Sequence, residues 1–305
     1  MLSLRTVTKR YGTLTALDNV SLDIAPGEFF GFLGPNGAGK STLMSLAAGL
    51  RSPDSGDVLL AGAVLSKENL TARHILGLVP QTIALYADLT AEQNLRIFGQ
   101  LYGLRGSDLK TRIDEALESV QLADRRHSPV KTFSGGMQRR LNIVASLLHR
   151  PKLLLCDEPT VGIDPQSRNA IFDYLEKLNR EGLTIIYSTH YMEEAERLCS
   201  RIGVIDHGNI LALGTLDELL TRLPFEDEIV FPEISDTATF AAQLSAHGQL
   251  DTVDGKHRFR PRPGYLLSAF FAEAERTGVA TRVFEIQRPS LEAVFLHLTG
   301  RKLRD

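Results

Sequence analysis

The stretch from Gly34 to Thr42 constrains this chain most, because it matches the phosphate-binding pattern G-x-x-x-x-G-K-[ST] at every fixed position. An apolar run before it, Phe29 to Leu33, predicts a buried strand, and Leu43 to Ala47 predicts the start of a helix. Glycines let successive N–H groups point at one spot, and the helix adds its positive end. The alternative is a glycine-rich turn before an ordinary helix. The full pattern favours a phosphate loop formed by Gly34, Pro35, Asn36, Gly37, Ala38, Gly39, Lys40, Ser41 and Thr42.

Within that pattern two side chains have defined tasks. Lys40 reaches the β- and γ-phosphates of a nucleotide, and the Ser41 hydroxyl ligates Mg²⁺.

Length and charge limit what the rest of the chain can be. At 305 residues, the chain predicts two domains, and a formal net charge of −3 gives no basic footprint for nucleic acid. Its two cysteines, Cys156 and Cys199, suggest neither a disulfide framework nor a metal knuckle, so a reducing cytosol fits best. The N-terminus lacks the apolar core of a signal peptide, and no apolar run reaches the roughly 18 residues of a membrane span. Any membrane role therefore needs a partner chain.

Polar residues follow three further apolar strands, two of which end in a single candidate residue. Gln81 comes after Ile75 to Val79, and His190 ends the run that begins at Leu183. Ligands in parallel α/β sheets lie at such strand ends, although a solvated glutamine and a structural histidine are the commoner readings of each residue alone.

The strand from Lys152 to Cys156 delivers two adjacent carboxylates, Asp157 and Glu158. Strand alternation predicts that they point in opposite directions, so that one serves magnesium and the other faces a water beside the phosphate. A solvated acidic turn is the alternative.

Two weaker signals lie outside these strand ends. Tyr11 sits in a strand turn, where packing is commoner than stacking on a ligand base. Ser134-Gly135-Gly136 opens a helix, which is more often a cap than an anion site. Between them, apolar residues at helical spacing from Thr90 to Leu122 predict a helical insert, and Thr90 with Gln93 resembles a capping box.

Taken together, and in this order, the motifs from Leu2 to Leu220 resemble the nucleotide-binding subunit of ATP-binding cassette (ABC) transporters. The resemblance implies a P-loop fold with a parallel-sheet core, an antiparallel β subdomain and a helical subdomain. It implies that the subunit hydrolyses ATP with Mg²⁺ and pairs with a second cassette, either an identical copy or a related one. It also implies a separate integral membrane permease, with the ATPase peripheral on the cytoplasmic face of the inner membrane.

The resemblance also implies a role for each motif residue, over and above the commoner readings of single residues. Tyr11 stacks on adenine, Gly34 to Thr42 form the Walker A loop, and Ser134, Gly135 and Gly136 belong to the signature motif. For the metal, Gln81 is the Q-loop glutamine and a magnesium ligand with Ser41, and Asp157 is the Walker B aspartate. For catalysis, Glu158 is the catalytic base and His190 the switch histidine. Asp164 is the D-loop aspartate.

The signature departs from the commonest form, L-S-G-G-Q, because Phe133 and Met137 occupy its first and fifth positions. This variant, with Gln138 to Leu141 after it, resembles the branch of bacterial drug, lipid or polysaccharide exporters. An importer ATPase, a soluble cassette that acts on nucleic acid or ribosomes and a non-hydrolysing cassette are the alternatives. The chain has no zinc insert, tandem cassette or long coiled coil, and it retains Glu158 and His190.

After Leu220 the sequence changes character. We expect the cassette to span residues 1–220, with its helical insert at about 85–135, and a small α+β domain to span 225–305. The predicted elements are strand 229–231, helix 237–246, strands 250–253 and 257–259, helix 265–275, strand 280–286 and helix 290–298. Up to residue 286, this order is that of a split ferredoxin-like unit. The last helix resembles the tail of the same exporter branch.

Overall fold

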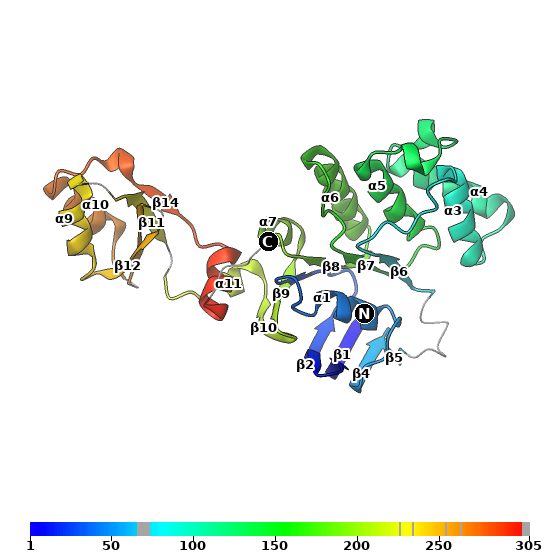
Figure 1. Cartoon of the computed structure of the whole chain (residues 1–305), viewed down its shortest axis with the longest axis horizontal. Helices are drawn as coiled ribbons and strands as arrows, with labels where there is room; N and C mark the ends of the chain where they lie inside the picture. Colours follow the sequence, from blue (N-terminus) through cyan, green and yellow to red (C-terminus); the bar gives the residue numbers. More distant parts are fainter. Residues whose placement is uncertain (66–73, 226, 234, 254, 263, 301–305) are drawn as a thin grey trace. The chain divides into compact units, whose positions relative to one another are not determined.

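The computed structural model divides the chain into two compact units, the first from Met1 to Leu213 and the second beginning at Gly214. It describes residues 1–65, 74–225, 227–233, 235–253, 255–262 and 264–300. Each unit is treated by itself below (Figure 1). The sequence prediction placed the boundary a few residues later, at 220–225. Glu226, in the predicted joint, lies outside the described residues.

The centre of the first unit is a sheet in which six strands of the described chain follow the order β10-β9-β3-β8-β7-β6. The four consecutive pairs from β9 to β6 are parallel. Its inner strands β3 and β8 are buried throughout and largely apolar, as a parallel sheet covered on both faces requires. The strands are β3 (Phe29–Leu33), β6 (Leu76–Val79), β7 (Leu153–Asp157), β8 (Thr184–Thr189), β9 (Arg201–Asp206) and β10 (Asn209–Gly214).

A second sheet of antiparallel strands has the order β2-β1-β4-β5. Its first hairpin turns after Tyr11, as the sequence predicts. Helix α1 (Lys40–Ala47) contacts both sheets, and their apolar side chains form one continuous core with it. The strands are β1 (Leu2–Tyr11), β2 (Leu14–Ile24), β4 (Ser55–Leu60) and β5 (Ala63–Val64).

A helical region with its own apolar core lies between β6 and β7 in the chain. The capping box at Thr90 is present, with Gln93 bonded in both directions, and it fixes the start of α3. The helices are α3 (Ala91–Leu101), α4 (Gly106–Ser119), α5 (Gly135–Ala145), α6 (Pro165–Arg180) and α7 (Met192–Leu198), with 3₁₀ turns at Ala123–Arg125 and Val130–Thr132. The first three form the insert, and the last two follow β7 and β8.

The second unit contains an antiparallel sheet of order β12-β13-β11-β14. An aromatic core that includes Phe231, Phe240, Phe259 and Phe270 packs between this sheet and its helices. Helices α8 and α11 contact each other. The elements are α8 (Leu216–Leu220), β11 (Glu228–Pro232), α9 (Ser235–Leu244), β12 (Gly248–Val253), β13 (Lys256–Pro261), α10 (Leu267–Arg276), a 3₁₀ turn (Thr281–Val283), β14 (Glu285–Gln287) and α11 (Leu291–Thr299).

One element of this unit differs from the sequence prediction. The expected strand at 280–286 is a 3₁₀ turn followed by the short strand β14. Val283 and Phe284 are apolar because they pack on the aromatic core from this turn, so their hydrophobicity does not reflect strand pairing.

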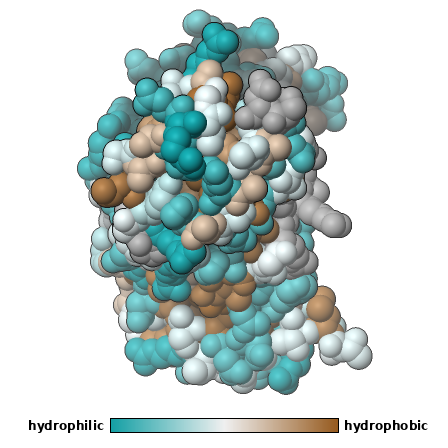
Figure 2. All heavy atoms as spheres, turned by 90° about the vertical axis from the view of Figure 1, so that its left-hand side faces the viewer, coloured by the Kyte–Doolittle hydropathy of each residue, from teal (hydrophilic) through white to brown (hydrophobic). Residues whose placement is uncertain are grey.

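Hydrophilic residues, in teal, predominate on the face shown in Figure 2, and brown hydrophobic residues gather below its centre. Among the described residues, no helix combines the length and the apolar character needed to cross a membrane.

The two cysteines give a direct test of the fold. Cys156 lies in β7 and Cys199 follows α7; both are buried, and burial raises the pKa of both thiols. We therefore expect N-ethylmaleimide to label neither residue within minutes in the native protein and both in urea, as read by mass spectrometry. Rapid native labelling of either cysteine would contradict this packing.

Candidate active site

The phosphate loop connects β3 to α1, as the sequence predicts. Gly37 and Gly39 have φ values of 83° and 110°, which side chains rarely adopt. A Cβ on Gly39 would also lie 2.6 Å from the Ala16 carbonyl oxygen. These two positions require glycine, and the turn they make brings the loop to the first residue of α1, Lys40.

Lys40 forms the central ion pair of the site. Its side chain is 4% exposed, and Nζ lies 3.1 Å from Glu158 Oε1. The same ammonium donates to the carbonyl oxygens of Gly34 and Pro35 at 2.8 and 3.1 Å. All three N–H donors of the lysine thus have partners inside the loop and at Glu158.

Glu158 brings the predicted strand-end residues together. Gln81 Nε2 donates to its Oε2 at 3.1 Å, and His190 Nδ1 lies 3.5 Å from its Oε1. Glu158 is only 5% exposed, so this carboxylate is held by side chains that follow three different strands. Lys40, Gln81, Glu158 and His190 therefore form one cluster.

Asp157 and Glu158 do not follow simple strand alternation. Strand β7 ends at Asp157, whose Oδ1 accepts a 2.6 Å hydrogen bond from Ser188 Oγ. Glu158 has φ 44°, and its N–H lies 3.2 Å from the Ser188 carbonyl oxygen and 3.0 Å from the Ser188 hydroxyl. A turn, rather than the pleat, therefore sets the direction of Glu158.

The signature residues lie at the start of α5. Ser134 is its N-cap and accepts a hydrogen bond from the Met137 N–H. A Cβ on Gly136 would collide with Ser167, near the start of α6, so glycine is needed there for close packing. Among the described residues, no hydrogen bond or ion pair joins Ser134, Gly135 or Gly136 to the Lys40 cluster.

In the described part of the chain, Asp164 and Tyr11 likewise form no hydrogen bond or ion pair with that cluster. Asp164 caps α6, and the hydrogen bond it accepts from the Ser167 N–H lowers the pKa of its carboxyl group. Tyr11 is 37% exposed at the end of β1, with Lys9 and Arg51 at 5.7 and 5.3 Å from its ring centre.

A buried carboxylate that the sequence analysis did not single out, Glu194, fixes the segments on which the cluster stands. It is 3% exposed and accepts hydrogen bonds from Thr160 (2.7 Å), Tyr187 (3.0 Å) and Thr189 (2.7 Å). Thr160 comes two residues after Glu158, and Thr189 directly precedes His190. The sequence signal was available, because Glu194 shares the inward stripe of α7 with Ala195 and Leu198.

Arg139 of α5 was also missed. Its guanidinium is 4% exposed and donates to the Pro80 and Gln81 carbonyl oxygens at 2.8 and 2.6 Å; burial lowers its pKa. The helix that the signature opens thereby holds the backbone at Gln81.

A loop of this shape, with a buried lysine and a carboxylate in one cluster, defines a P-loop nucleotide-binding protein. The ABC transporter family pattern matches residues 17–161. Linearmycin resistance ATP-binding protein LnrL of Bacillus subtilis is 43% identical over 100% of both chains, and Nod factor export ATP-binding protein I of Ralstonia nicotianae is 38% identical over 100% of this chain and 95% of that protein. This chain belongs to the ATP-binding proteins of ABC transporters, which are ATPases.

A solved structure agrees with the assignment. The dimeric cassette in a post-hydrolysis state with ADP and Pi is 29% identical, with a TM-score of 0.65 over 70% of this chain and 98% of that one. The predicted fold class is confirmed: a P-loop cassette with parallel and antiparallel sheets, a helical region and an additional C-terminal α+β region.

The Glu194 network predicts a stability effect. Glu194→Ala removes the acceptor of three buried hydroxyl groups, of which only Thr160 and Tyr187 can still bond each other, so we expect the free energy of unfolding to fall by about 2–4 kcal/mol in urea denaturation. Its neighbour on α7, Glu193, is exposed, and Glu193→Ala should change the free energy by less than about 0.5 kcal/mol. Equal effects of the two substitutions would contradict the network.

Proposed function

We propose that this chain is the ATP-hydrolysing subunit of an exporter and that Glu158 is its general base. The observation that supports this role most directly is the contact of Glu158 with Lys40, Gln81 and His190 at 3.1 to 3.5 Å. A buried carboxylate beside the phosphate loop has the reach to accept a proton from a water that attacks the γ-phosphate. The products are ADP and phosphate.

Lys40 supplies the coupling between ATP binding and this base. The γ-phosphate and Glu158 compete for the same ammonium, since the other two N–H donors of Lys40 go to loop carbonyls. When phosphate takes the third donor, Glu158 loses its strongest positive partner and is free to orient and deprotonate water. His190, beside Glu158, then contacts the γ-phosphate and stabilises its charge.

The oxygen donors near the loop suit magnesium, which prefers carboxylate, amide carbonyl and hydroxyl oxygens. The Gln81 amide nitrogen faces Glu158, so its oxygen is left to bind metal together with Ser41 Oγ and Asp157. A bound Mg²⁺ neutralises charge on the β- and γ-phosphates. Ser188 orients Asp157 through its hydroxyl.

The signature residues act in a dimer. Ser134 and Gly135 are exposed at the amino end of α5, where N–H groups and the hydroxyl suit a phosphate. Their separation from Lys40 within one chain supports contact with the nucleotide of a second cassette, with Asp164 at the same face. Tyr11, exposed and flanked by cations, is placed to stack on adenine.

Export through a separate permease is supported by the relatives, since the Ralstonia protein is named for Nod factor export and the Bacillus protein for linearmycin resistance. Both are matched over the whole of this chain, C-terminal region included. We propose the cytoplasmic face of the inner membrane as its place of action, an identical or related cassette as its partner, and no nucleic-acid partner.

Replacement of the base separates chemistry from binding. Glu158→Gln keeps the shape and loses the proton acceptor, so we expect turnover to fall by about 10²–10⁴-fold while ATP still binds. Phosphate release and equilibrium nucleotide binding measure the two effects. Glu193→Gln, on the exposed face of α7, is the matched control and should hydrolyse ATP at the wild-type rate. Wild-type turnover in Glu158→Gln would remove Glu158 from this role.

The partner is tested by purification of tagged Glu158→Gln protein from membranes with ATP, a variant that we expect to hold ATP without turnover. The transporter function predicts that a multi-spanning membrane protein is recovered with it, identified by mass spectrometry. The Lys40→Ala variant, which lacks the phosphate ligand, serves as the nucleotide control. Recovery of ribosomes or DNA-repair proteins in place of a permease would contradict the proposal.

A further inference from the structure

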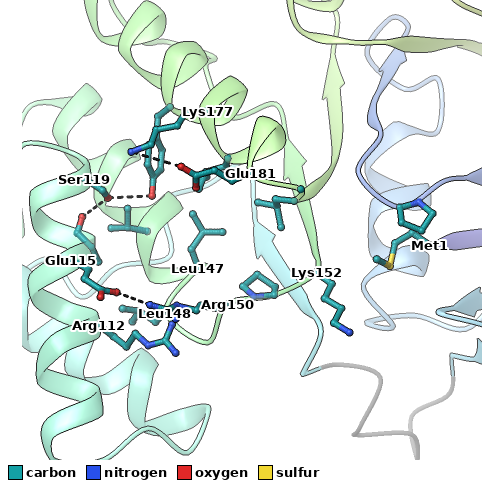
Figure 3. Close-up of a pocket in the computed structure, with 18 residues that line it drawn as sticks. Met1, Arg112, Glu115, Ser119, Leu147, Leu148, Arg150, Lys152, Lys177 and Glu181 are labelled. Atoms are coloured by element: carbon teal, nitrogen blue, oxygen red, sulfur yellow. Dashed lines mark hydrogen bonds and ion pairs between the residues drawn. The ribbon is translucent and has the colours of Figure 1, made fainter.

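A cavity of about 720 Å³ opens in the first unit between helices α4, α5 and α6. Figure 3 shows it with Arg112 and Glu115 on α4 and Leu147, Leu148 and Arg150 after α5. Residues 151–152 and 182–183, which lead into β7 and β8, also line it, together with Met1 and Pro26. The cavity therefore lies at the amino ends of these strands, whereas Glu158 and His190 follow their carboxyl ends, so it is distinct from the nucleotide site.

The wall of this cavity is largely apolar. Leu147, Leu178 and Leu183 are only half-buried, so part of each side chain faces the opening, and Tyr174 lies among them. Its volume falls within the range of about 300–1,000 Å³ that small-molecule sites occupy. The cavity is open on one side, and a small molecule of this size fits within it.

The rim carries an excess of positive charge. Two of its four cations have carboxylate partners, Arg150 with Glu115 at 3.0 Å and Lys177 with Glu181 at 3.9 Å (Figure 3). The other two, Arg112 and Lys152, form no ion pair with any residue in the described part of the chain. The rim is thus complementary to an anion.

Arg112 gives this charge a defined position. Its Nη1 atom is buried and has no hydrogen-bond partner among the described residues. A buried donor without a partner costs free energy, and a guanidinium edge matches the two oxygens of a carboxylate.

We propose that this cavity binds a small amphiphile with one carboxylate group. The carboxylate accepts hydrogen bonds from Arg112, with Lys152 adding positive charge at the rim. The apolar part of the ligand covers Leu147, Leu178 and Leu183. Because the walls come from the helical insert and from α6, the ligand joins two parts of the cassette without contacting the phosphate loop.

Calorimetric titration with three probes of equal chain length tests the proposal: decanoate and decyltrimethylammonium, each below its micelle concentration, and 1-decanol below its solubility limit. We expect decanoate to bind saturably and about 10-fold more tightly than the cationic probe. Arg112→Gln should weaken decanoate binding about 10-fold, the effect of one charge-assisted hydrogen-bonding group, and leave decanol binding unchanged. Lys152→Gln, at an exposed position, should also weaken decanoate binding.

The matched control is Lys110→Gln, an exposed cation on α4 that does not line the cavity, and it should bind decanoate like the wild type. Unfolding curves identify any variant that is not folded. No saturable decanoate binding, equal affinity for both charged probes, or unchanged affinity in both Arg112→Gln and Lys152→Gln would overturn the proposal.

Discussion

The ion pair between Lys40 and Glu158 is the interaction on which the architecture of this site depends. Both side chains are almost fully buried, at 4% and 5% exposure. Removing two charges from water is expensive, and the attraction offsets that cost only when further hydrogen bonds complete the pair. Here two loop carbonyl oxygens accept the other hydrogen bonds of the lysine, and the Gln81 amide donates one to the carboxylate. The pair therefore forms only when the loop, the end of β6 and the end of β7 lie next to one another.

The backbone places these side chains by adopting conformations that are themselves unfavourable. Glu158 holds φ 44°, a conformation that side chains adopt rarely, and Gly39 could not carry a Cβ. Glu194 ties together the segments on either side of the cluster through Thr160 and Thr189. Arg139 does the same for Gln81 from α5. The proposed base, Glu158, is therefore linked to α5 through the side chains of Gln81 and Arg139.

Sequence reasoning found those parts of the structure that local pattern determines. The phosphate loop, the buried strands and the capping box at Thr90 are each encoded within a few residues, and the structure has them. The contact of Glu158 with Lys40 could be anticipated only as a meeting of strand ends. Glu194 and Arg139 were missed because their importance comes from partners far away in sequence. The prediction of a strand at 280–286 was wrong because core packing and strand pairing both produce the same apolar pattern in the sequence.

In the proposed mechanism, ATP and Glu158 compete for the ammonium of Lys40. Equilibrium binding of a non-hydrolysable ATP analogue to wild-type and Glu158→Gln protein measures this competition without turnover. We expect the variant to bind more tightly, by about 10-fold or 1.4 kcal/mol, because Lys40 no longer has to leave a buried carboxylate. The gain should vanish when Lys40→Ala is introduced into both backgrounds. Equal or weaker binding by Glu158→Gln would show that Glu158 and ATP do not compete for Lys40.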